Sequence, residues 1–391
     1  EDPDLNLFFS GRIVPERIIE RLAIYHETQI LPHKTLIIFD EIQNSPRALT
    51  SLKYFCEQAP DYHVAAAGSL LGLKLAHRSP FPVGKVTFLN LYPLSFGEYL
   101  DAAGKTKLRQ FLEDKRDFES MPAVFHEELT GFLKMYYYIG GMPEPVKQYL
   151  EDKNLTGVRQ IQNDILDTYL QDFSKYTGKP EAVRITDTWN TIPQQLAREN
   201  KKFKYSEISQ NARSRDYHDA IRRLADAGLV YKCYNIKTPK LPLSGYREDN
   251  VFKLYLLDTG LLGAMLNLSA RTIVVGNRLF SDYNGAFTEN YVAQELMAGP
   301  LFRDVHLKEL YYWTSKSRAE VDFVVQFDDA VYPLEVKAGT SRGKTSLKLF
   351  GEKYVPPILS RTTLMNFKRE KNLCNYPLYA VKHFPAVSRQ L

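Results

Sequence analysis

Two runs of β-branched and aromatic residues late in the chain constrain the fold most strongly. They are Ala319–Val325 and Val331–Lys337, separated by a short acidic segment that is typical of a hairpin turn. Because side chains alternate along a strand, Asp322 is expected on the polar face of the first strand, and Glu335 and Lys337 on that of the second. The sequence therefore predicts two carboxylates and an amine on adjacent strands.

This grouping is suited to hydrolysis of a phosphodiester. Two hard oxygen ligands can hold Mg²⁺, which makes Asp322 and Glu335 the predicted metal ligands. The ammonium group of Lys337 could orient water or stabilise developing charge. The alternative is a solvated hairpin on which Glu335 and Lys337 form a surface ion pair, since such alternations of charge are common on exposed sheets.

A helix is predicted upstream of the hairpin, over residues 285–296, with an apolar stripe that does not include Glu289. The order of four residues resembles the restriction-endonuclease-like fold and its Asp…Glu-x-Lys signature. Glu289 and Asp322 come first, and Glu335 and Lys337 follow with one residue between them. The resemblance implies a metal-dependent nuclease site. Asp322 and Glu335 would bind the metal directly, and Glu289 would be an outer ligand or the ligand of a second metal. Lys337 would orient the attacking water or help to deprotonate it.

The chain has 391 residues, which is enough for about two to four domains with full cores. Its 44% hydrophobic and 25% charged residues are typical of an ordinary soluble globular protein. The formal net charge of +5 is too small to indicate a nucleic-acid partner by itself, so any basic surface must be local.

Three cysteines, Cys56, Cys233 and Cys374, lie far apart and are odd in number, which predicts neither a disulfide framework nor a zinc site. A reducing cytosol is the natural setting, so a cytoplasmic location is expected. No apolar run approaches the roughly 20 residues that span a bilayer, and no leader opens the sequence, so no membrane partner is expected. Because the first residue is not Met, further residues are expected upstream.

The stretch Leu36–Glu41 is a continuous apolar run that ends in two acids. Such a run predicts a strand buried on both faces of a parallel sheet, with Asp40 and Glu41 at its carboxyl end, where open α/β sheets bind ligands. This is the form of a Walker B element, in which Asp40 assists Mg²⁺ and Glu41 activates water; an ordinary strand end is the alternative. A second buried strand, Val64–Ser69, places Ser69 where an ATPase has a sensor group, although Ser69 could equally cap a helix.

Residues 35–99 resemble the bacterial AAA-type P-loop ATPases that carry a winged helix and a nuclease-like C-terminal domain of unassigned role. Later segments extend the resemblance over nearly the whole chain. The matching segments are Ile38–Gln43, Ala67–Leu71, Gly84–Val86, Leu91–Tyr99, Tyr138–Glu144 and Leu257–Leu262. The resemblance implies ATP and Mg²⁺ as cofactors, with Asp40, Glu41 and Ser69 as cofactor-binding residues.

A P-loop of the form G-x-x-x-x-G-K-[ST] should precede the Walker B strand, but nothing before Leu36 fits it. Residues 338–345 satisfy a relaxed version and follow a strand, yet they come far after the Walker B strand and directly after Lys337. The N–H groups of a P-loop supply most of the phosphate contacts. The ATP site is therefore expected to be incomplete in this chain, which should not bind ATP at micromolar affinity.

Residues 109–187 are mostly helical in pattern and are predicted to form a helical lid. Residues 188–265 then combine three helices with a β-ribbon, which resembles a winged-helix domain. Basic residues are concentrated in this part of the chain. Those predicted to contact phosphate are Arg213, Arg215, Arg222 and Arg223, with Lys201, Lys202 and Lys204 nearby. The alternative is a solvated helix face that only mediates domain contacts.

Taken together, these patterns predict a multidomain α/β protein. The expected domains are a P-loop ATPase-like core with a parallel sheet that lacks its P-loop, a helical lid, a winged-helix domain and a restriction-endonuclease-like domain, over residues 1–108, 109–187, 188–265 and 266–391. The expected function is ATP-dependent action on nucleic acid, with DNA favoured. One alternative is an ATPase scaffold or signalling protein whose inactive nuclease-like domain binds a protein partner. Another is a DNA-binding regulator that needs neither nucleotide nor metal, and a homo-oligomer is compatible with each of them.

Overall fold

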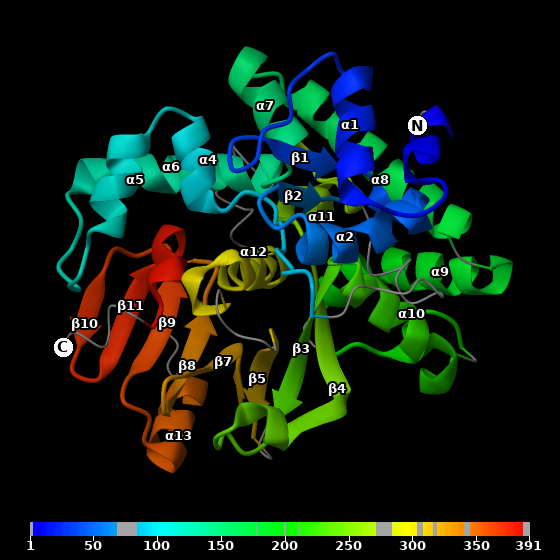
Figure 1. Cartoon of the computed structure of the whole chain (residues 1–391). Helices are drawn as coiled ribbons and strands as arrows, with labels where there is room; N and C mark the ends of the chain where they lie inside the picture. The colour runs from blue at the N-terminus through cyan, green and yellow to red at the C-terminus, as the bar shows by residue number, and fades with distance from the viewer. Residues whose placement is uncertain are drawn as a thin grey trace. The chain divides into compact units, whose positions relative to one another are not determined.

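The computed structural model describes residues 3–68, 84–176, 178–198, 201–210, 212–270, 284–302, 308–315, 319–339 and 345–385. It is a mixed α/β structure with two compact units, one made by residues 1–91 and 226–228 and the other by residues 92–225 and 229–391. Figure 1 labels the helices and strands of both units. Within the described parts of the chain, no helix combines the length and the apolar character needed to cross a membrane.

In the described residues of the first unit, two α-helices pack against a two-stranded parallel sheet. Its elements are η1 (Pro3–Phe9), α1 (Pro15–Tyr25), β1 (Leu36–Phe39), η2 (Ile42–Asn44), α2 (Pro46–Gln58) and β2 (His63–Ala66). Proline opens both α-helices, at a position where its missing N–H has no helical partner to lose. Ser45 caps α2 by accepting a hydrogen bond from the amide of Ala48.

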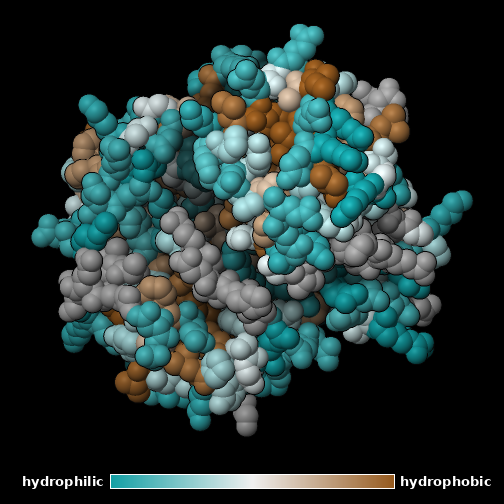
Figure 2. Space-filling model, in the orientation of Figure 1, coloured by the Kyte–Doolittle hydropathy of each residue, from teal (hydrophilic) through white to brown (hydrophobic). Residues whose placement is uncertain are grey.

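One face of β1 is open within this unit. Ile37 is buried in the core that η1, α1 and α2 form, but Leu36 and Ile38 are 56% and 62% exposed. Figure 2 shows apolar side chains at the surface in the region of β1 and α1. The prediction that this strand is buried on both faces is therefore wrong for the unit, because its helices cover only the Ile37 face of the described sheet.

The second unit contains most of the helices. They are α4 (Phe96–Ala102), α5 (Thr106–Glu113), α6 (Ala123–Ile139), α7 (Pro143–Asp152), α8 (Leu155–Tyr176), α9 (Lys179–Leu196), η3 (Tyr205–Glu207), α10 (Ser214–Asp226), η4 (Leu243–Tyr246), α11 (Thr259–Met265), α12 (Asn284–Ala298), η6 (Pro300–Phe302), α13 (Thr345–Tyr354) and η7 (Leu378–His383). The stretch predicted as a helical lid is thus helical over most of its length. Its three consecutive tyrosines, 136–138, are buried in the core.

The strands of the second unit form two sheets. They are β3 (Val230–Ile236), β4 (Arg247–Leu256), β5 (Leu310–Thr314), β6 (Glu320–Val321), β7 (Phe323–Phe327), β8 (Ala330–Val336), β9 (Leu359–Thr363), β10 (Lys368–Glu370) and β11 (Leu373–Pro377). One sheet has the order β4-β3-β5-β6 and the other the order β10-β11-β9-β8-β7. Both are mixed, since β3 and β5 are parallel, as are β8, β9 and β11, whereas the remaining pairs are antiparallel.

This unit joins parts that the sequence assigned to separate domains. Helix α9 runs across the expected boundary at 187/188, and β3 and β4 share a sheet with β5 and β6, which lie beyond the expected boundary at 265/266. The order of α9, α10 and the β3–β4 hairpin is that expected of a winged helix, but β3 also pairs with β5. The winged-helix assignment and the finer division into domains stay predictions.

The predicted hairpin at 319–337 is present, but its first strand is interrupted at Asp322. Strand β6 pairs with β5 in one sheet, whereas β7 pairs with β8 in the other. The chain therefore passes from one sheet to the other at Asp322. The prediction of a single continuous strand is wrong. The solvated hairpin is also excluded, because Glu335 is only 6% exposed. Figure 1 shows α12 lying across the ends of the strands, and α12 packs against both β4 and β8.

Three of the segments that carry the family resemblance meet in one buried polar network. The amide of Gly141 donates to Asp258 Oδ2 at 2.6 Å, and its carbonyl accepts from the amide of Leu94 at 2.7 Å. Gln294 Oε1 on α12 accepts from both the amide and the hydroxyl of Thr259 at 3.0 Å. Burial raises the pKa of Asp258 to about 6, although hydrogen bonds from the amides of Gly141, Leu261 and Gly260 oppose the shift. The network ties α6, α11 and α12 together.

Helix α12 also carries the buried Glu295, which accepts from the amide of Phe96 at 2.7 Å, at the start of α4. Ser95 and Glu98 close the same helix end with a capping box. Burial raises the pKa of Glu295 to about 7.

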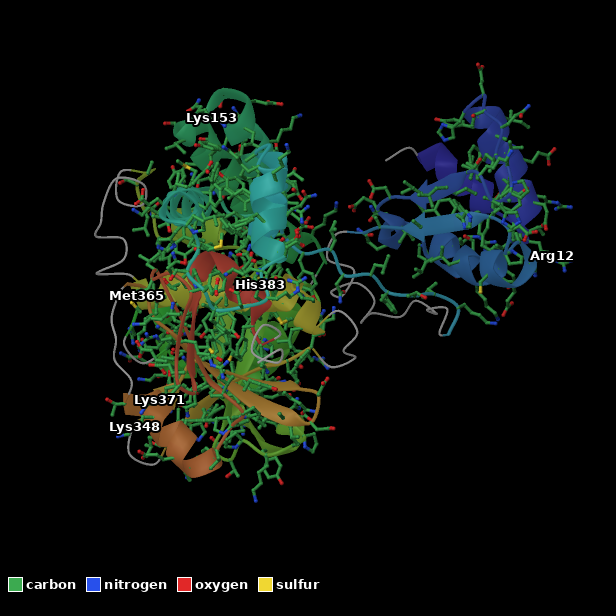
Figure 3. All side chains as sticks on the ribbon, turned by 90° about the vertical axis from the view of Figure 1, so that its left-hand side faces the viewer. Arg12, Lys153, Lys348, Met365, Lys371 and His383 are labelled. Atoms are coloured by element: carbon green, nitrogen blue, oxygen red, sulfur yellow. The ribbon has the colours of Figure 1, made fainter. Side chains whose placement is uncertain are left out.

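His383 of η7, labelled in Figure 3, lies between the helices and the sheets of this unit. Burial lowers the pKa of His383 to about 4.

Candidate functional site

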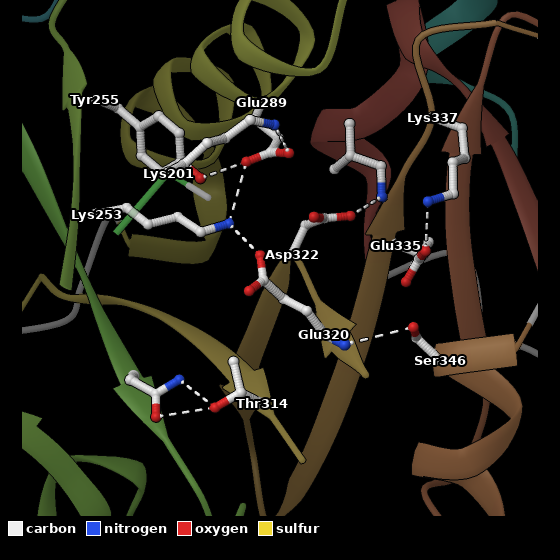
Figure 4. Close-up of polar contacts among 12 residues, drawn as sticks. Lys201, Lys253, Tyr255, Glu289, Thr314, Glu320, Asp322, Glu335, Lys337 and Ser346 are labelled. Atoms are coloured by element: carbon white, nitrogen blue, oxygen red, sulfur yellow. Dashed lines mark hydrogen bonds and ion pairs between the residues drawn. The ribbon is translucent and has the colours of Figure 1, made fainter. Parts of the chain in front are cut away.

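Charged side chains converge where the two sheets of the second unit meet (Figure 4). The acids are Glu289 on α12, Glu320 on β6, Asp322 between β6 and β7, and Glu335 on β8, and the lysines are Lys201 before η3, Lys253 on β4 and Lys337 after β8. The structure thus brings together all four residues of the predicted nuclease signature. Because they come from a helix and from both sheets, their arrangement depends on the fold of the whole unit.

Asp322 lies close to two other carboxyl groups. Its Oδ2 accepts from the amide of Val336 at 2.7 Å, which holds the start of β7 against the end of β8. Burial raises the pKa of Asp322 well above its usual range, and the charges of Glu289 and Glu335 raise it further. The three carboxyl groups are therefore near enough to repel one another.

Glu335 has one carboxylate oxygen that accepts no hydrogen bond from the described residues. Its Oε1 lies 2.6 Å from the ammonium of Lys337. Its Oε2 is buried and accepts no hydrogen bond within the described parts of the chain. Burial raises the pKa of Glu335, and the charge of Lys337 opposes this shift. An unpartnered buried acceptor is costly, so it indicates a place where a ligand would be bound.

Glu289, by contrast, is fully occupied by protein groups. It forms an ion pair with Lys201, lies 3.3 Å from Lys253 Nζ, and accepts from the hydroxyl of Tyr255 at 2.8 Å. Burial alone would raise the pKa of Glu289, but the two lysines and the hydroxyl lower it to about 2. This carboxylate is therefore charged and neutralised without any bound ion.

Lys253 links two of the acids and is almost completely buried. Its Nζ lies 2.7 Å from Glu320 Oε1 and 3.3 Å from Glu289 Oε2. Burial would lower the pKa of Lys253, but the two carboxylates raise it well above its usual value. The sequence analysis missed Lys253. The one indication in the sequence was its position within an apolar strand, because a charge that is buried there must have a partner.

The carboxylates of the site determine whether it fits a divalent cation. Among the described residues, no three or more His, Cys, Asp or Glu side chains are grouped so as to hold a metal ion. Mg²⁺, however, is commonly held by one or two carboxylates and keeps several waters. The free oxygen of Glu335 and the neighbouring Asp322 fit such a two-carboxylate site. Direct metal ligation by these two residues stays a prediction.

A polar row that the sequence analysis did not identify continues from Glu335 across the sheet. Arg361 on β9 lies in register between Glu335 on β8 and Asn375 on β11. Arg361 is 2% exposed, and its Nε donates to Asn375 Oδ1 at 3.1 Å. Nothing in the sequence of β9 indicates that an arginine lies beside Glu335.

In the first unit, Asp40 and Glu41 follow β1 directly, beside the end of β2. The amide of Ala67 donates to the carbonyl of Phe39 at 2.9 Å, and the amide of Ile42 donates to that of Ala67 at 3.0 Å. These bonds tie together the carboxyl ends of two parallel strands. The acidic pair therefore lies at the predicted edge of the sheet.

Glu41 adopts a left-handed backbone conformation, with φ of 50°, which is uncommon for a residue other than glycine. Its Oε2 accepts from Gln43 Nε2 at 2.6 Å, and the exposed Asp40 accepts from the amide of Glu41 at 2.9 Å. Both carboxylates lie at the surface of the unit. The predicted sensor residue, Ser69, lies outside the described residues.

The predicted phosphate-binding arginines lie on or beside α10, but not on one face. Arg213, Arg215 and Arg222 are exposed. Arg223 is only 8% exposed and forms an ion pair with Glu181 on α9. Its prediction as a phosphate contact needs correction, because position 223 adjoins the apolar stripe that packs α10 against the unit. Lys201 is likewise engaged with Glu289 instead of facing solvent.

Comparison with family models divides the chain into three parts. Residues 4–100 match the AAA domain, residues 131–272 a Domain of unknown function (DUF8612), and residues 284–381 a Domain of unknown function (DUF4143). The first match covers β1, Asp40 and Glu41. This part of the chain is therefore an AAA-type ATPase-like domain, which confirms the coarser part of the resemblance.

Similar proteins are found among curated sequences and solved structures. The uncharacterized proteins Mb2031c of Mycobacterium bovis and Rv2008c of Mycobacterium tuberculosis are each 32% identical over 126 residues, which cover 32% of this chain and 24% of theirs. The aligned part thus spans about a quarter of the length of these relatives. The Walker-type ATPase paby2304 of Pyrococcus abyssi is similar in structure with a TM-score of 0.39 and 13% identity, over 64% of this chain and 67% of that one.

Proposed function

We propose that this chain joins an AAA-type ATPase to a metal-dependent phosphodiesterase site and acts on nucleic acid, with duplex DNA as the favoured substrate. The observation that carries the proposal is the buried Oε2 of Glu335, which has no hydrogen-bond partner among the described residues and lies in a cluster with Asp322 and Lys337. The cluster offers two oxygen ligands and an ammonium group. These are the parts that hydrolysis of a phosphodiester requires.

The residues would divide the work as follows. Asp322 and Glu335 would hold Mg²⁺ or Mn²⁺, which would act as a Lewis acid on the phosphate. Lys337, 2.6 Å from Glu335 Oε1, would place its charge beside the phosphate or the attacking water. Glu289 would stay outside direct ligation, since protein groups already occupy it.

In an ATP site completed by a P-loop, Asp40 would assist the Mg²⁺ of bound ATP and Glu41 would activate water, with Ser69 as a third polar group. Both acids stand at the carboxyl end of a parallel strand, the usual place for ligands in open α/β sheets. Hydrolysis of ATP would supply the energy for movement along or remodelling of nucleic acid.

Glu335→Gln tests the metal site. The substitution keeps the shape of the side chain but removes its charge, so it should abolish Mn²⁺ binding at concentrations that saturate the unchanged chain. Calorimetric titration with Mn²⁺ and electron paramagnetic resonance of free Mn²⁺ would measure this. Glu352→Gln is the matched control, because Glu352 lies on α13 with a 61% exposed side chain and should leave Mn²⁺ binding unchanged.

The second candidate function is a scaffold whose nuclease-like part is inactive and binds a protein. Lys201 and Lys253 favour it, since they already neutralise Glu289 as a metal would. The same titration separates the two. If the chain binds no Mn²⁺ at millimolar concentration, the proposed phosphodiesterase function is contradicted and the scaffold function remains.

Nucleic-acid binding is expected to depend on the exposed face of α10. Replacing Arg213, Arg215 and Arg222 together by Ala should weaken binding of duplex DNA to the same extent for every DNA sequence. Each lost phosphate contact lowers the dependence of log K on log salt by about 0.9. Fluorescence anisotropy at several salt concentrations measures both quantities. A chain with the exposed Lys147, Lys348 and Lys371 changed to Ala is the control, and equal loss in both variants would place the contact surface elsewhere.

A further inference from the structure

Lys201 reaches the candidate site from outside the two sheets. It lies in the segment that joins α9 to η3, and this segment leads on to α10. Its ammonium forms an ion pair with Glu289, and the side chains of Lys201 and Glu289 are only 13% and 6% exposed. The contact therefore connects the segment that leads to α10, with its exposed arginines, to the acids of the site.

The position of the Lys201 ammonium is well defined by its surroundings. A Cβ atom on Gly285, in the first turn of α12, would lie 2.6 Å from Lys201 Nζ, so the lysine lies directly over a glycine. The backbone next to it is also held. The amide of Phe203 donates to the carbonyl of Phe252 at 2.8 Å, the two rings stack 5.6 Å apart, and the amide of Lys204 donates to Gln195 at 2.7 Å.

The balance of charge shows what this lysine does. Glu289, Asp322 and Glu335 lie close enough to repel one another, and a cluster of this kind normally requires cations. Lys253 on β4 and Lys337 after β8 supply two of them, at Glu289 and at Glu335. Lys201 supplies the third, on the side of Glu289 that Lys253 does not contact, since the two lysines approach different oxygens of that carboxylate.

We infer that Lys201 acts as a built-in cation that occupies Glu289 Oε1 in place of a divalent metal ion, so that the site accepts one metal ion instead of two. This inference rests on the proposed phosphodiesterase function and specifies the metal content of its site. Removing the Lys201 charge frees Glu289 Oε1 in the cluster that also holds Asp322 (Figure 4), and a second divalent cation then has these two carboxylates to bind. Lys201 is a positioning residue and does not touch the reacting atoms.

The test is the number of Mn²⁺ ions bound by the full chain, measured by electron paramagnetic resonance and by calorimetric titration. Lys201→Met is expected to bind one Mn²⁺ more than the unchanged chain, and Lys201→Arg, which keeps the charge, to bind the same number. Lys204→Met is the matched control, because Lys204 lies in the same segment but is exposed. The double variant Lys201→Met with Glu289→Gln should lose the extra ion, which shows that the effect passes through Glu289.

If Lys201→Met does not fold, a different single variant still tests the inference. Glu289→Gln alone should leave the number of Mn²⁺ ions of the unchanged chain as it is, because Lys201 keeps Glu289 from binding metal. Loss of that ion in Glu289→Gln, or no gain in a folded Lys201→Met, would overturn the role of Lys201. An unchanged chain without any Mn²⁺ would instead overturn the proposed function, and the gain of one ion in Lys201→Met would still decide the role of Lys201.

Discussion

Gly141→Ala is expected to destabilise the protein by roughly 3 kcal/mol or more, as overpacking and a lost buried hydrogen bond combine. A Cβ atom at this position would overlap the carbonyl oxygen of Leu94 and lie 2.9 Å from its amide nitrogen. Both atoms belong to backbone and cannot rotate away. The same substitution would disturb the bond from the Gly141 amide to the buried carboxylate of Asp258. Three separate parts of the chain would lose their contact at once.

Denaturation by urea, followed by circular dichroism, measures this change in the free energy of unfolding. Gly131→Ala is the control, because Gly131 lies inside α6 and a Cβ atom there would meet nothing within 4 Å. That variant should be neutral or more stable by up to about 1 kcal/mol, since Ala favours a helix over Gly. Equal destabilisation in both variants would mean that the packing around Gly141 does not control stability.

Three of the segments that carry the family resemblance have a structural role in this network. Leu94, Gly141 and Asp258 lie far apart in sequence, and each looks ordinary in its own segment. Only the fold shows that a glycine is required at 141, because the backbone of Leu94 and the hydroxyl of Tyr136 occupy the place of a Cβ atom. Sequence patterns could locate these segments but could not assign them a structural role.

The candidate site was predicted in part. Alternation along the hairpin and the helical stripe before it located Glu289, Asp322 and Glu335, because these residues break a local pattern. Local patterns do not show which distant side chains reach the same point. Lys201 and Lys253 lie 88 and 36 residues before Glu289, and long flexible side chains let them reach it from other elements. The interruption of the strand at Asp322 was also hidden, since it results from pairing with two different sheets.

Burial of Arg223 could have been anticipated from helical spacing. Its neighbours Ala220, Ile221 and Leu224 form the apolar stripe of α10, and Arg223 lies beside that stripe, whereas Arg222 lies away from it. An arginine at such an edge is more often held by a buried acid than free to meet a ligand. Glu181, which holds it, belongs to another helix and gives no signal of its own.

Lys337→Ala is expected to reduce metal-dependent cleavage of nucleic acid by roughly 10²-fold or more, the loss typical of a missing proton-transfer or charge-stabilising group. Lys337 lies directly after β8, and its ammonium is 2.6 Å from Glu335 Oε1. Its side chain is 33% exposed, so it borders the solvent from which a phosphate would enter, whereas Glu335 lies beneath it. Cleavage of labelled DNA and RNA by the full chain, with Mn²⁺ and with or without ATP, measures the rate.

The variant must keep its metal for this loss to identify a role in the chemical step. Removal of the ammonium frees the second oxygen of Glu335, so Mn²⁺ affinity should stay the same or increase. Glu335→Gln should lose Mn²⁺ and cleavage together. Lys348→Ala should lose neither, because Lys348 lies on α13 with a 75% exposed side chain. If Lys337→Ala loses Mn²⁺ as well, the lysine only supports the ligand geometry. If it retains both Mn²⁺ and full cleavage, the water and the phosphate are held by another group, and Arg361, the buried cation in register with Glu335, is the next residue to replace.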